Sequence, residues 1–563
     1  MIQIAALFAL MLALPFPAPS SQSLKADLVL RNARIWTGEA SMPWAQAVAI
    51  RGNRIVAVGE NSRMSALVGE RTEIIEASGK LALPGFNDAH THFLSGSLGL
   101  FEVDLTGAKN LGEIRQRVHD YAREHPRQTW ITGAGWEYSV FPDKRLPTRA
   151  DLDAAVADRP VYLRAYDGHT GWANSKALEM AGITAKSRFQ GYGELVVDRR
   201  TGEPTGALKE SAQGLVRAAI PAPSRETQLA ALRAGLQLAA SLGITSLQNA
   251  SGNPEELRLY QELRDRGELT ARVSMAMSIS QATSEGDLRK FASHLASSPG
   301  ALLRTKAVKI LLDGVIESHT AAMLEPYSDN APTSGTPSMP ANALNRLVAA
   351  ADKMGLQIYI HAIGDRAVRM ALDAYEAARK MNGAHDARFR IEHIETISAS
   401  DIPRFAELGV IASMEPIHAD PGTNDVWEPA VGPERAQRAF AWRALEKAGA
   451  RLVFSSDWPA TISVDPIRGI HNAVNRRTID GLPPEGWIPE QRISVESAVR
   501  AYTQGGAFAS FEENVKGTIA EGKLADIVLL SQDVFKIEPM QIYRTKVALT
   551  IFDGKVLHRK AGS

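Results

Sequence analysis

Residues 26–80 alternate apolar and polar side chains with the period of a half-buried β-strand. The stretch ADLVLRNARIWTG (26–38) shows this alternation. AVAIRGNRIVAVG (47–59) consists of two such runs on either side of Gly52-Asn53, a turn that favours a β-hairpin. TEIIEASGKLAL (72–83) adds one more run before Pro84. The pattern predicts a small β-domain at the start of the chain.

A very similar pattern returns at the other end of the chain. KGTIAEGKLADIVLLS (516–531) is followed by VALTIFDGKVLH (547–558), which has a turn signal at Asp553-Gly554. Two strand-rich pieces at opposite ends suggest one discontinuous β-sandwich domain, and we expect it to comprise residues 24–84 and 505–563.

Between these pieces, residues 85–504 alternate short apolar runs with amphipathic helix patterns, for example at 224–243 and 341–355. Near-continuous apolar strands separated by helices are typical of a parallel α/β fold. The number of repeats favours a (β/α)8 barrel with insertions, because such a barrel needs only about 250 residues. A doubly wound open sheet is the alternative, but the chain has no glycine-rich nucleotide fingerprint to support it. The apolar runs that we expect to be buried parallel strands are PVYLRAY (160–166), ITSLQNA (244–250), RVSMAMSI (272–279), AVKILLDG (307–314), QIYIHAIG (357–364), RFRIEHI (388–394), GVIASMEP (409–416) and RLVFSSDW (451–458).

The amino-acid composition limits the possible partners of the protein and the residues that could bind a metal. The chain has 563 residues, 63 basic and 63 acidic side chains, and no cysteine. A net charge of zero gives no indication of a nucleic-acid partner, so we expect a small-molecule substrate; a homo-oligomer is compatible with the sequence. Without cysteine, disulfides and thiolate ligands are excluded, and a metal site must use His, Asp, Glu or a modified Lys.

The chain begins with an apolar run from Ile2 to Phe16 that ends in small and proline residues. The run is short for a membrane span and suits the core of a signal peptide, although no Lys or Arg precedes it. We expect residues 1–23 to be a cleaved signal peptide and the protein to be periplasmic or secreted. A buried N-terminus, or a start codon assigned too early, is the alternative. No other stretch is apolar and long enough to span a membrane.

Histidines and an aspartate follow the predicted strands. In NDAHTH, His90 and His92 are two positions apart, so on a strand both imidazoles face the same side. His361 and His393 come at the ends of two further apolar runs, and Asp457 follows a third. The carboxyl ends of barrel strands meet at one mouth, where catalytic groups gather. Imidazole and carboxylate ligands suit zinc, manganese, iron or nickel.

Each of these residues also has a structural interpretation. A lone histidine at a strand end is more often a hydrogen-bonded structural residue, and Asp457 could cap the segment after it. Lys309, which lies within an apolar strand, could extend its amine to solvent or pair with Asp313. The succession His-x-His, Lys, His, His, Asp, each at a predicted strand end, favours a metal site over the separate structural interpretations.

That succession resembles the amidohydrolase superfamily, and in particular amidohydrolase family 3, the YtcJ-like branch that includes N-substituted formamide deformylases. The motifs that carry the resemblance are LPGFNDAHTHF (83–93), GWEYSVFPDKRLPTRADLDAAVADRPVYL (135–163), DGHTGWANSKAL (167–178), WPATIS (458–463) and GTIAEGKLADIVLL (517–530). The resemblance implies a metal-bearing barrel with a small β-sandwich built from both termini. It also implies the metal-site residues His90, His92, His361, His393 and Asp457.

Lys309 matches the position at which many relatives carry a lysine that carbon dioxide has carbamylated and that bridges two metals. A carbamylated Lys309 and one or two divalent ions, zinc favoured, are therefore expected. Glu210, in GALKESA, is a rival source of a bridging carboxylate. His169 and His418 are candidates for binding the substrate.

The mechanism follows from this ligand set. A divalent metal lowers the pKa of a bound water from 15.7 toward about 7. Asp457 is expected to take the water's proton and return it to the leaving amine. The leading hypothesis is a metal-dependent hydrolase of an amide-type C–N bond in an N-substituted amide or N-acyl amine. The alternatives are an isomerase or C–C hydrolase on the same fold and an exported protein that only binds a ligand. Seven tryptophans near loop motifs are a weak indication of an aromatic substrate.

Overall fold

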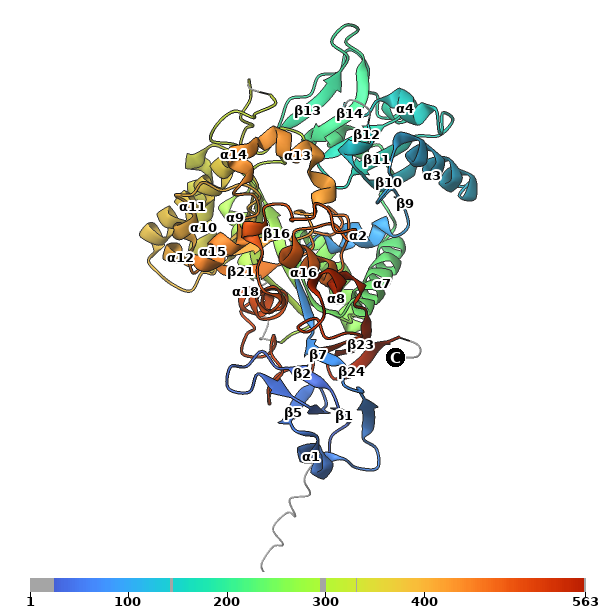
Figure 1. Ribbon diagram of the computed structural model, residues 1–563. Helices are drawn as coiled ribbons and strands as arrows, with labels where there is room; N and C mark the ends of the chain where they lie inside the picture. The colour runs from blue at the N-terminus through green and yellow to red at the C-terminus, as the bar shows by residue number, and fades with distance from the viewer. Residues whose placement is uncertain (1–24, 142–144, 294–299, 331, 561–563) are drawn as a thin grey trace, which may run out of the picture.

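The computed structural model describes residues 25–141, 145–293, 300–330 and 332–560. At its centre, eight strands form one sheet in the order β21-β20-β19-β18-β17-β16-β15-β8, and every neighbouring pair is parallel (Figure 1). The strands are β8 Phe86–Thr91, β15 Ile244–Gly252, β16 Arg272–Ile279, β17 Leu303–Leu311, β18 Gln357–Ala362, β19 Arg390–His393, β20 Ile411–Met414 and β21 Arg451–Phe454.

The first and last strands of this sheet come together just beyond the end of β21. The amide of Asp457 donates to the carbonyl oxygen of His90 at 2.8 Å. The amide of Ser456 donates to Asp88 Oδ1 at 2.9 Å. These contacts nearly close the sheet, so the predicted barrel is confirmed and the doubly wound open sheet is wrong.

Helices cover the outside of the barrel, and two of them follow the predicted patterns, α7 Arg225–Ser241 and α10 Ala341–Lys353. Their alanine and leucine side chains pack against the strands in one continuous core. The other helices around the barrel include α8 Pro254–Asp265, α9 Glu285–Ser293, α11 Asp365–Asn382, α12 Ile402–Leu408, α15 Trp442–Lys447, α16 Pro466–Asn475 and α17 Val495–Arg500.

Two further sheets lie at the lower end of Figure 1, and one of them combines strands from both ends of the chain. One sheet has the order β5-β4-β1-β6 and the other has the order β24-β23-β22-β7-β2-β3. The predicted turns at Gly52-Asn53 and Asp553-Gly554 join antiparallel neighbours. A separate apolar core contains residues of both sheets, which confirms the predicted sandwich. The strands are β1 Leu28–Arg31, β2 Arg34–Trp36, β3 Trp44–Ala45, β4 Ala47–Arg51, β5 Arg54–Gly59, β6 Glu73–Glu76, β7 Leu81–Pro84, β22 Ile527–Leu530, β23 Val547–Phe552 and β24 Lys555–Arg559.

A buried ion-pair network fastens the sandwich to the barrel. Arg272, at the start of β16, donates to Asp526 at 2.8 Å and to Asp553 at 2.6 Å. Its side chain is almost fully buried, so both carboxylates compensate a charge that would otherwise be costly to desolvate. This network holds the barrel at the end opposite to the strand ends that carry the histidines.

A third sheet, inserted between β8 and β15, stands beside the mouth of the barrel at the top of Figure 1. It corrects one prediction. The run PVYLRAY is not a barrel strand: as β11 it pairs with β10 and β12 of the inserted sheet. Burial alone does not assign a strand to a sheet, and β11 is buried by a separate core around Trp136 and Trp172. The strands of the insert are β9 Val103–Asp104, β10 Ile131–Trp136, β11 Val161–Ala165, β12 Thr170–Ala173, β13 Gly193–Val197 and β14 Pro204–Glu210, and its helices include α3 Leu111–Glu124, α4 Arg149–Asp153 and α5 Ser175–Met180.

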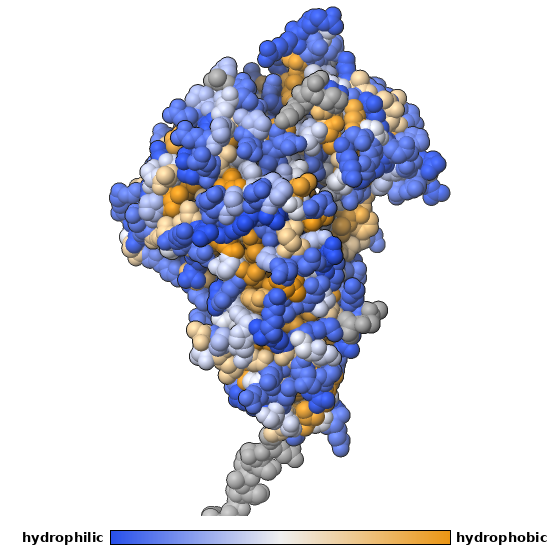
Figure 2. Space-filling view, in the orientation of Figure 1, coloured by the Kyte–Doolittle hydropathy of each residue, from blue (hydrophilic) through white to orange (hydrophobic). Residues whose placement is uncertain are grey.

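The surface is mixed in character. On the face shown in Figure 2, hydrophilic residues predominate at the tip of the β13–β14 hairpin, and apolar residues are scattered over the barrel. None of the helices in the described part of the chain is long and apolar enough to cross a membrane. The expected signal peptide, residues 1–23, lies outside the described residues, and an exported location stays a prediction.

Candidate active site

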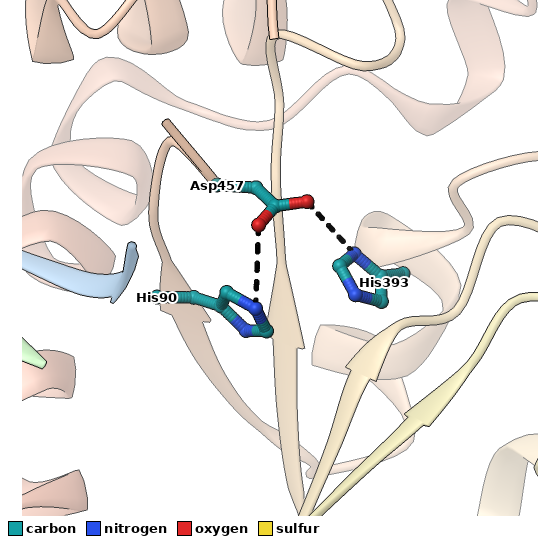
Figure 3. Close-up of side chains that lie close together, drawn as sticks. All are labelled: His90, His393 and Asp457. Atoms are coloured by element: carbon teal, nitrogen blue, oxygen red, sulfur yellow. Dashed lines mark ion pairs between the residues drawn. The ribbon is translucent and has the colours of Figure 1, made fainter. Parts of the chain in front are cut away.

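Three of the predicted ligands converge at the mouth of the barrel (Figure 3). His90 comes from β8, His393 ends β19 and Asp457 follows β21. Asp457 Oδ1 lies 3.4 Å from His90 Nε2, and Asp457 Oδ2 lies 3.9 Å from His393 Nδ1. One nitrogen or oxygen atom of each residue lies within 4.8 Å of the others, which is the spacing that a single ion needs.

The other predicted ligands surround this group. His92 Nε2 lies 3.2 Å from Asp457 Oδ1, and Lys309 Nζ lies 3.1 Å from His90 Nε2. The imidazole of His361 packs on that of His393, with ring centroids 4.3 Å apart. Its Nε2 donates to the carbonyl oxygen of Gly314 at 3.3 Å, which leaves Nδ1 as its free nitrogen. The structure therefore brings all six residues together.

Lys309 does not pair with Asp313, so that structural alternative is wrong. Asp313 instead accepts the backbone amides of Ala322, Ile363 and Gly364 at 2.8–3.1 Å. Its carboxylate fixes the loop that follows β18, and the amine of Lys309 is left facing His90.

Unusual backbone angles place two of the ligands. His393 has a φ of 75° and Asp457 has a φ of 60°, both in the left-handed region that few residues other than glycine adopt. Ile394, next in the chain, is also left-handed at 52°, which is costly for a β-branched residue. In a regular strand, adjacent side chains point to opposite faces. The distorted end of β19 lets both Glu392 and His393 reach the same site.

Glu392 holds His90 in place. Its Oε2 accepts the Nδ1–H of His90 at 2.6 Å, and both of its oxygens accept from the buried guanidinium of Arg390 at 2.9 Å. A carboxylate only accepts, so the proton of His90 is on Nδ1 and Nε2 presents its lone pair to the site. In metal sites, the ring nitrogen of a histidine that does not bind the metal commonly donates its proton to a carboxylate.

Glu415, just beyond β20, is the residue that the sequence interpretation missed most clearly. It is fully buried, and its Oε2 lies 2.9 Å from His393 Nδ1. It joins two further groups that could hold an ion, one with His393 and His418 and one with His90 and Glu392. The signal was present in the sequence, because Glu415 follows an apolar strand as His361 and His393 do.

Comparison with known proteins identifies the family. The model of a family described as "Amidohydrolase family" matches residues 73–558. The chain belongs to the amidohydrolase family. The predicted resemblance is confirmed.

Three relatives match this amidohydrolase over nearly its whole length. It is 32% identical to the protein LONG AFTER FAR-RED 3 of Arabidopsis thaliana, over 95% of this chain and 92% of that protein. It is 30% identical to the putative amidohydrolase YtcJ of Bacillus subtilis, over 92% and 96% of the two chains. It is 28% identical to the N-substituted formamide deformylase of Arthrobacter pascens, over 95% and 99%.

Solved structures agree with the family. A protein described as an uncharacterized metal-dependent hydrolase from Pyrococcus horikoshii superposes with a TM-score of 0.72 at 27% identity, covering 91% of this amidohydrolase and 99% of that chain. A second, from Pyrococcus furiosus, gives 0.69 at 30% identity and covers 90% and 100%. These structures support the expectation of a metal-dependent hydrolase.

The residues present in the amidohydrolase fit a divalent metal. Three buried atoms at the site, His393 Nδ1, Asp457 Oδ1 and Glu415 Oε2, have no partner in hydrogen-bonding geometry among the described residues. Buried polar atoms without a partner are rare and require an explanation, which a metal ion would supply. Burial also keeps the pKa of both His90 and His393 well below its usual value, so each is a neutral ligand.

Asp457 is ionised in the amidohydrolase. Burial alone would raise its pKa, but the nearby His92 and His418 outweigh burial and lower the pKa below its usual value. A carboxylate at this position can ligate a cation through one oxygen and accept a proton on the other.

Of the two predicted substrate-binding histidines, His169 is better placed. It reaches the mouth from the inserted sheet, and Glu210 Oε2 accepts from its Nδ1 at 2.8 Å. Glu210 therefore pairs with His169 and stays outside the groups of residues that could hold an ion. Although burial opposes it, Glu210 raises the pKa of His169 to about 10. His418 donates from Nε2 to the carbonyl oxygen of Ala460 at 2.9 Å and so has less freedom to bind a substrate.

Replacing Glu392 with glutamine tests the support of His90. We expect Glu392→Gln to weaken zinc binding by about 10–100-fold, because the amide no longer fixes the proton on His90 Nδ1. Zinc affinity is measured by competition with a chelating dye. Glu376→Gln, at a carboxylate on α11 that pairs with Lys380, is the matched control. Unchanged affinity in Glu392→Gln, with an intact thermal transition, would contradict the role given to Glu392.

Proposed function

We propose that this chain is a metal-dependent hydrolase that cleaves the carbon–nitrogen bond of an N-substituted amide or N-acyl amine. The observation that carries the proposal is the convergence of His90, His393 and Asp457, with buried atoms that lack partners, beside a cavity of about 520 Å³. The same cavity is lined by His92, Lys309 and His361. A candidate cation site, a carboxylate that can accept a proton and room for a substrate thus lie side by side, and together they support the proposal.

The residues of the chain account for the proton transfers. When bound, a divalent cation supplies Lewis-acid polarisation of a carbonyl group and acidifies a water molecule. Asp457 accepts the proton of the attacking water through its carboxylate. It then delivers that proton to the leaving nitrogen as the C–N bond breaks, so that the products are a carboxylic acid and an amine.

His169 lines the same cavity as the residues that would hold the cation. Since Glu210 holds Nδ1 of His169, its Nε2 side is available to the substrate, and we assign His169 to orienting the carbonyl group. His418 lines a smaller space that adjoins the cavity, together with Glu317 and Glu395. We assign His418 to the wall of this smaller space.

Zinc is the favoured ion because the donors are imidazole nitrogens and carboxylate oxygens. Support for C–N cleavage comes from the relative of Arthrobacter pascens, whose name states that it deformylates N-substituted formamides. The tryptophans give no support for an aromatic substrate, because none of the described residues lining the cavity is a tryptophan and the largest are packed in cores.

A hydrolysis screen tests the function. Protein stripped by a chelator and reloaded with zinc, manganese, iron or nickel is offered N-formyl and N-acyl amines, and released amine is measured. We expect amine release from the reloaded protein only, because stripping removes the Lewis acid while Asp457 remains. Full activity in stripped protein that elemental analysis shows to be metal-free would contradict the proposal.

The same screen separates the alternatives. Cleavage of ketones in which carbon replaces the amide nitrogen would indicate a C–C hydrolase. Conversion of a compound without release of an amine would indicate an isomerase. Binding of these compounds without conversion under every metal would indicate a protein that only binds its ligand.

A further inference from the structure

The cavity beside the candidate metal site has a wall that the mechanism above does not use. One part of it is apolar, formed by Ile279 and by Leu311, which is 45% exposed. Another part is basic, formed by Arg164 and Arg217 of the inserted region. Both parts belong to the same cavity as Lys309 and Asp457, so one bound molecule can contact all of them.

A sharp bend in the chain brings Arg217 to this wall. Glu210, at the end of β14, has a φ of 50° and a ψ of −129°, a conformation that non-glycine residues seldom adopt. The chain beyond the bend turns into the short helix α6 Gly214–Arg217. As a result Glu210, Ser211, Gln213 and Arg217 all line the cavity. Strain of this kind tends to be kept where it positions functional groups.

All but one of the charged side chains of the wall have a polar partner. Asp167 accepts from Tyr138 at 2.9 Å and Glu210 accepts from His169 at 2.8 Å. Arg164 pairs with Glu102 at 2.9 Å.

Arg217 is the exception. Its side chain is exposed, and among the residues that the structure describes no side chain forms a hydrogen bond or an ion pair with its guanidinium. The phenol of Tyr162 is close enough to be influenced by its charge, but it is neutral and already donates to Gln213 at 2.8 Å. The cavity therefore presents a planar cation that no acidic side chain of the described residues pairs with. Guanidinium groups match carboxylates in a bidentate geometry.

We propose that the substrate of this site is an acylated amine that carries a carboxylate, and that Arg217 binds this carboxylate. The inference rests on the proposed function, since it concerns the substrate of the same site. Ile279 and Leu311 contact the apolar part of the substrate. Arg217 is thus a specificity-determining residue that contacts the substrate away from the bond that breaks.

The test separates binding from turnover by using ligands without an amide. 3-Benzoylpropanoate carries a ketone in place of the amide and a terminal carboxylate, and 1-phenylpentane-1,4-dione is its neutral counterpart of nearly the same shape. Their binding to the zinc-loaded full-length protein is measured by calorimetry, and again with hexanoyl in place of benzoyl. Arg217→Gln is compared with Arg217→Lys and with Arg199→Gln, an exposed arginine on the β13–β14 turn that does not line the cavity.

We expect the wild type and Arg199→Gln to bind the acids at least tenfold more tightly than the neutral ketones, because hydrogen bonds to charged groups are the stronger ones. Arg217→Gln should remove this preference and Arg217→Lys should restore part of it. A wild type without a preference for the acids, or a preference that survives in Arg217→Gln, overturns the proposal.

Hydrolysis is followed separately with N-benzoylglycine and N-benzoylglycinamide. If the zinc-loaded wild type prefers the keto acids but releases no amine from any acylated amine, the proposed function fails while the assignment of Arg217 stands. If it hydrolyses both amides equally and binds acids and ketones equally, the assignment of Arg217 fails while the function stands.

Discussion

Asp457→Asn is expected to lower kcat by about 10²–10⁴-fold, the range that a general acid–base group contributes. Asparagine nearly matches aspartate in shape, but its amide cannot accept the proton of the attacking water. The fold should persist, because the backbone amide of residue 457 keeps its bond to the carbonyl oxygen of His90. The measurement is kcat with the amide that the screen identifies, together with the metal content of the same sample.

The metal content decides how a loss of activity is interpreted. A variant that retains its metal and loses turnover has lost the proton acceptor, whereas a variant without metal has lost a ligand. Asp480→Asn, at an exposed aspartate, is the matched control. Activity of Asp457→Asn within threefold of the wild type would mean that the proton is handled elsewhere, with His169 the next residue to replace.

Lys309→Ala is expected to lower kcat/KM by at least 100-fold and to reduce the amount of bound metal. Lys309 is buried beside His90, and burial lowers the pKa of its amine, which favours the neutral form. A neutral amine attacks carbon dioxide, forms an N–C bond and releases a proton, and the resulting carbamate can bridge two cations. We therefore predict a carbamylated Lys309 and two metal ions. Loss of a supporting group near a metal already costs 10–100-fold, so loss of a bridging ligand should cost at least the upper value.

Small acids provide the decisive control for this variant. Acetate or propionate, supplied in millimolar amounts, should fill the space of the missing carbamate and restore part of both the activity and the metal content. Lys306→Ala, on the same strand but stacked on Phe511, should leave both unchanged. A high-resolution map with an unmodified Lys309 beside a single fully occupied metal would rule out the bridge and leave a mononuclear hydrolase.

The candidate site was predictable where local pattern determines geometry. Strand periodicity alone predicts that His90 and His92 face the same side. The positions of His361, His393 and Asp457 after apolar strands predict that they converge, because the ends of parallel strands meet at one mouth. Glu392 was missed for a physical reason. Alternation places Glu392 and His393 on opposite faces, and the left-handed backbone of His393, which overrides this rule, leaves no mark in the sequence.

The inserted sheet shows a second limit. PVYLRAY has the apolar character of a barrel strand, and only tertiary contacts with Trp136 and Trp172 assign it elsewhere. Arg217 carried no signal at all, because its role depends on the bend at Glu210 and on the absence of a partner carboxylate. The residues of a cavity wall come from segments that lie far apart in the sequence, whereas the residues of a strand are consecutive. No local pattern therefore predicts a cavity wall.

The pairing of β7 with β22 has a consequence for how the chain acquires its structure during synthesis. Ala82 lies opposite Leu529, so the strand emerges from the ribosome long before its neighbour exists. Until then β7 has an open edge, and its apolar face lacks the other half of its core. Unpaired edges of this kind are prone to join other chains. Expression of fragments that end before residue 527 should therefore give aggregated protein. We also expect the nascent chain to depend on a chaperone until strands β22–β24 have been synthesised.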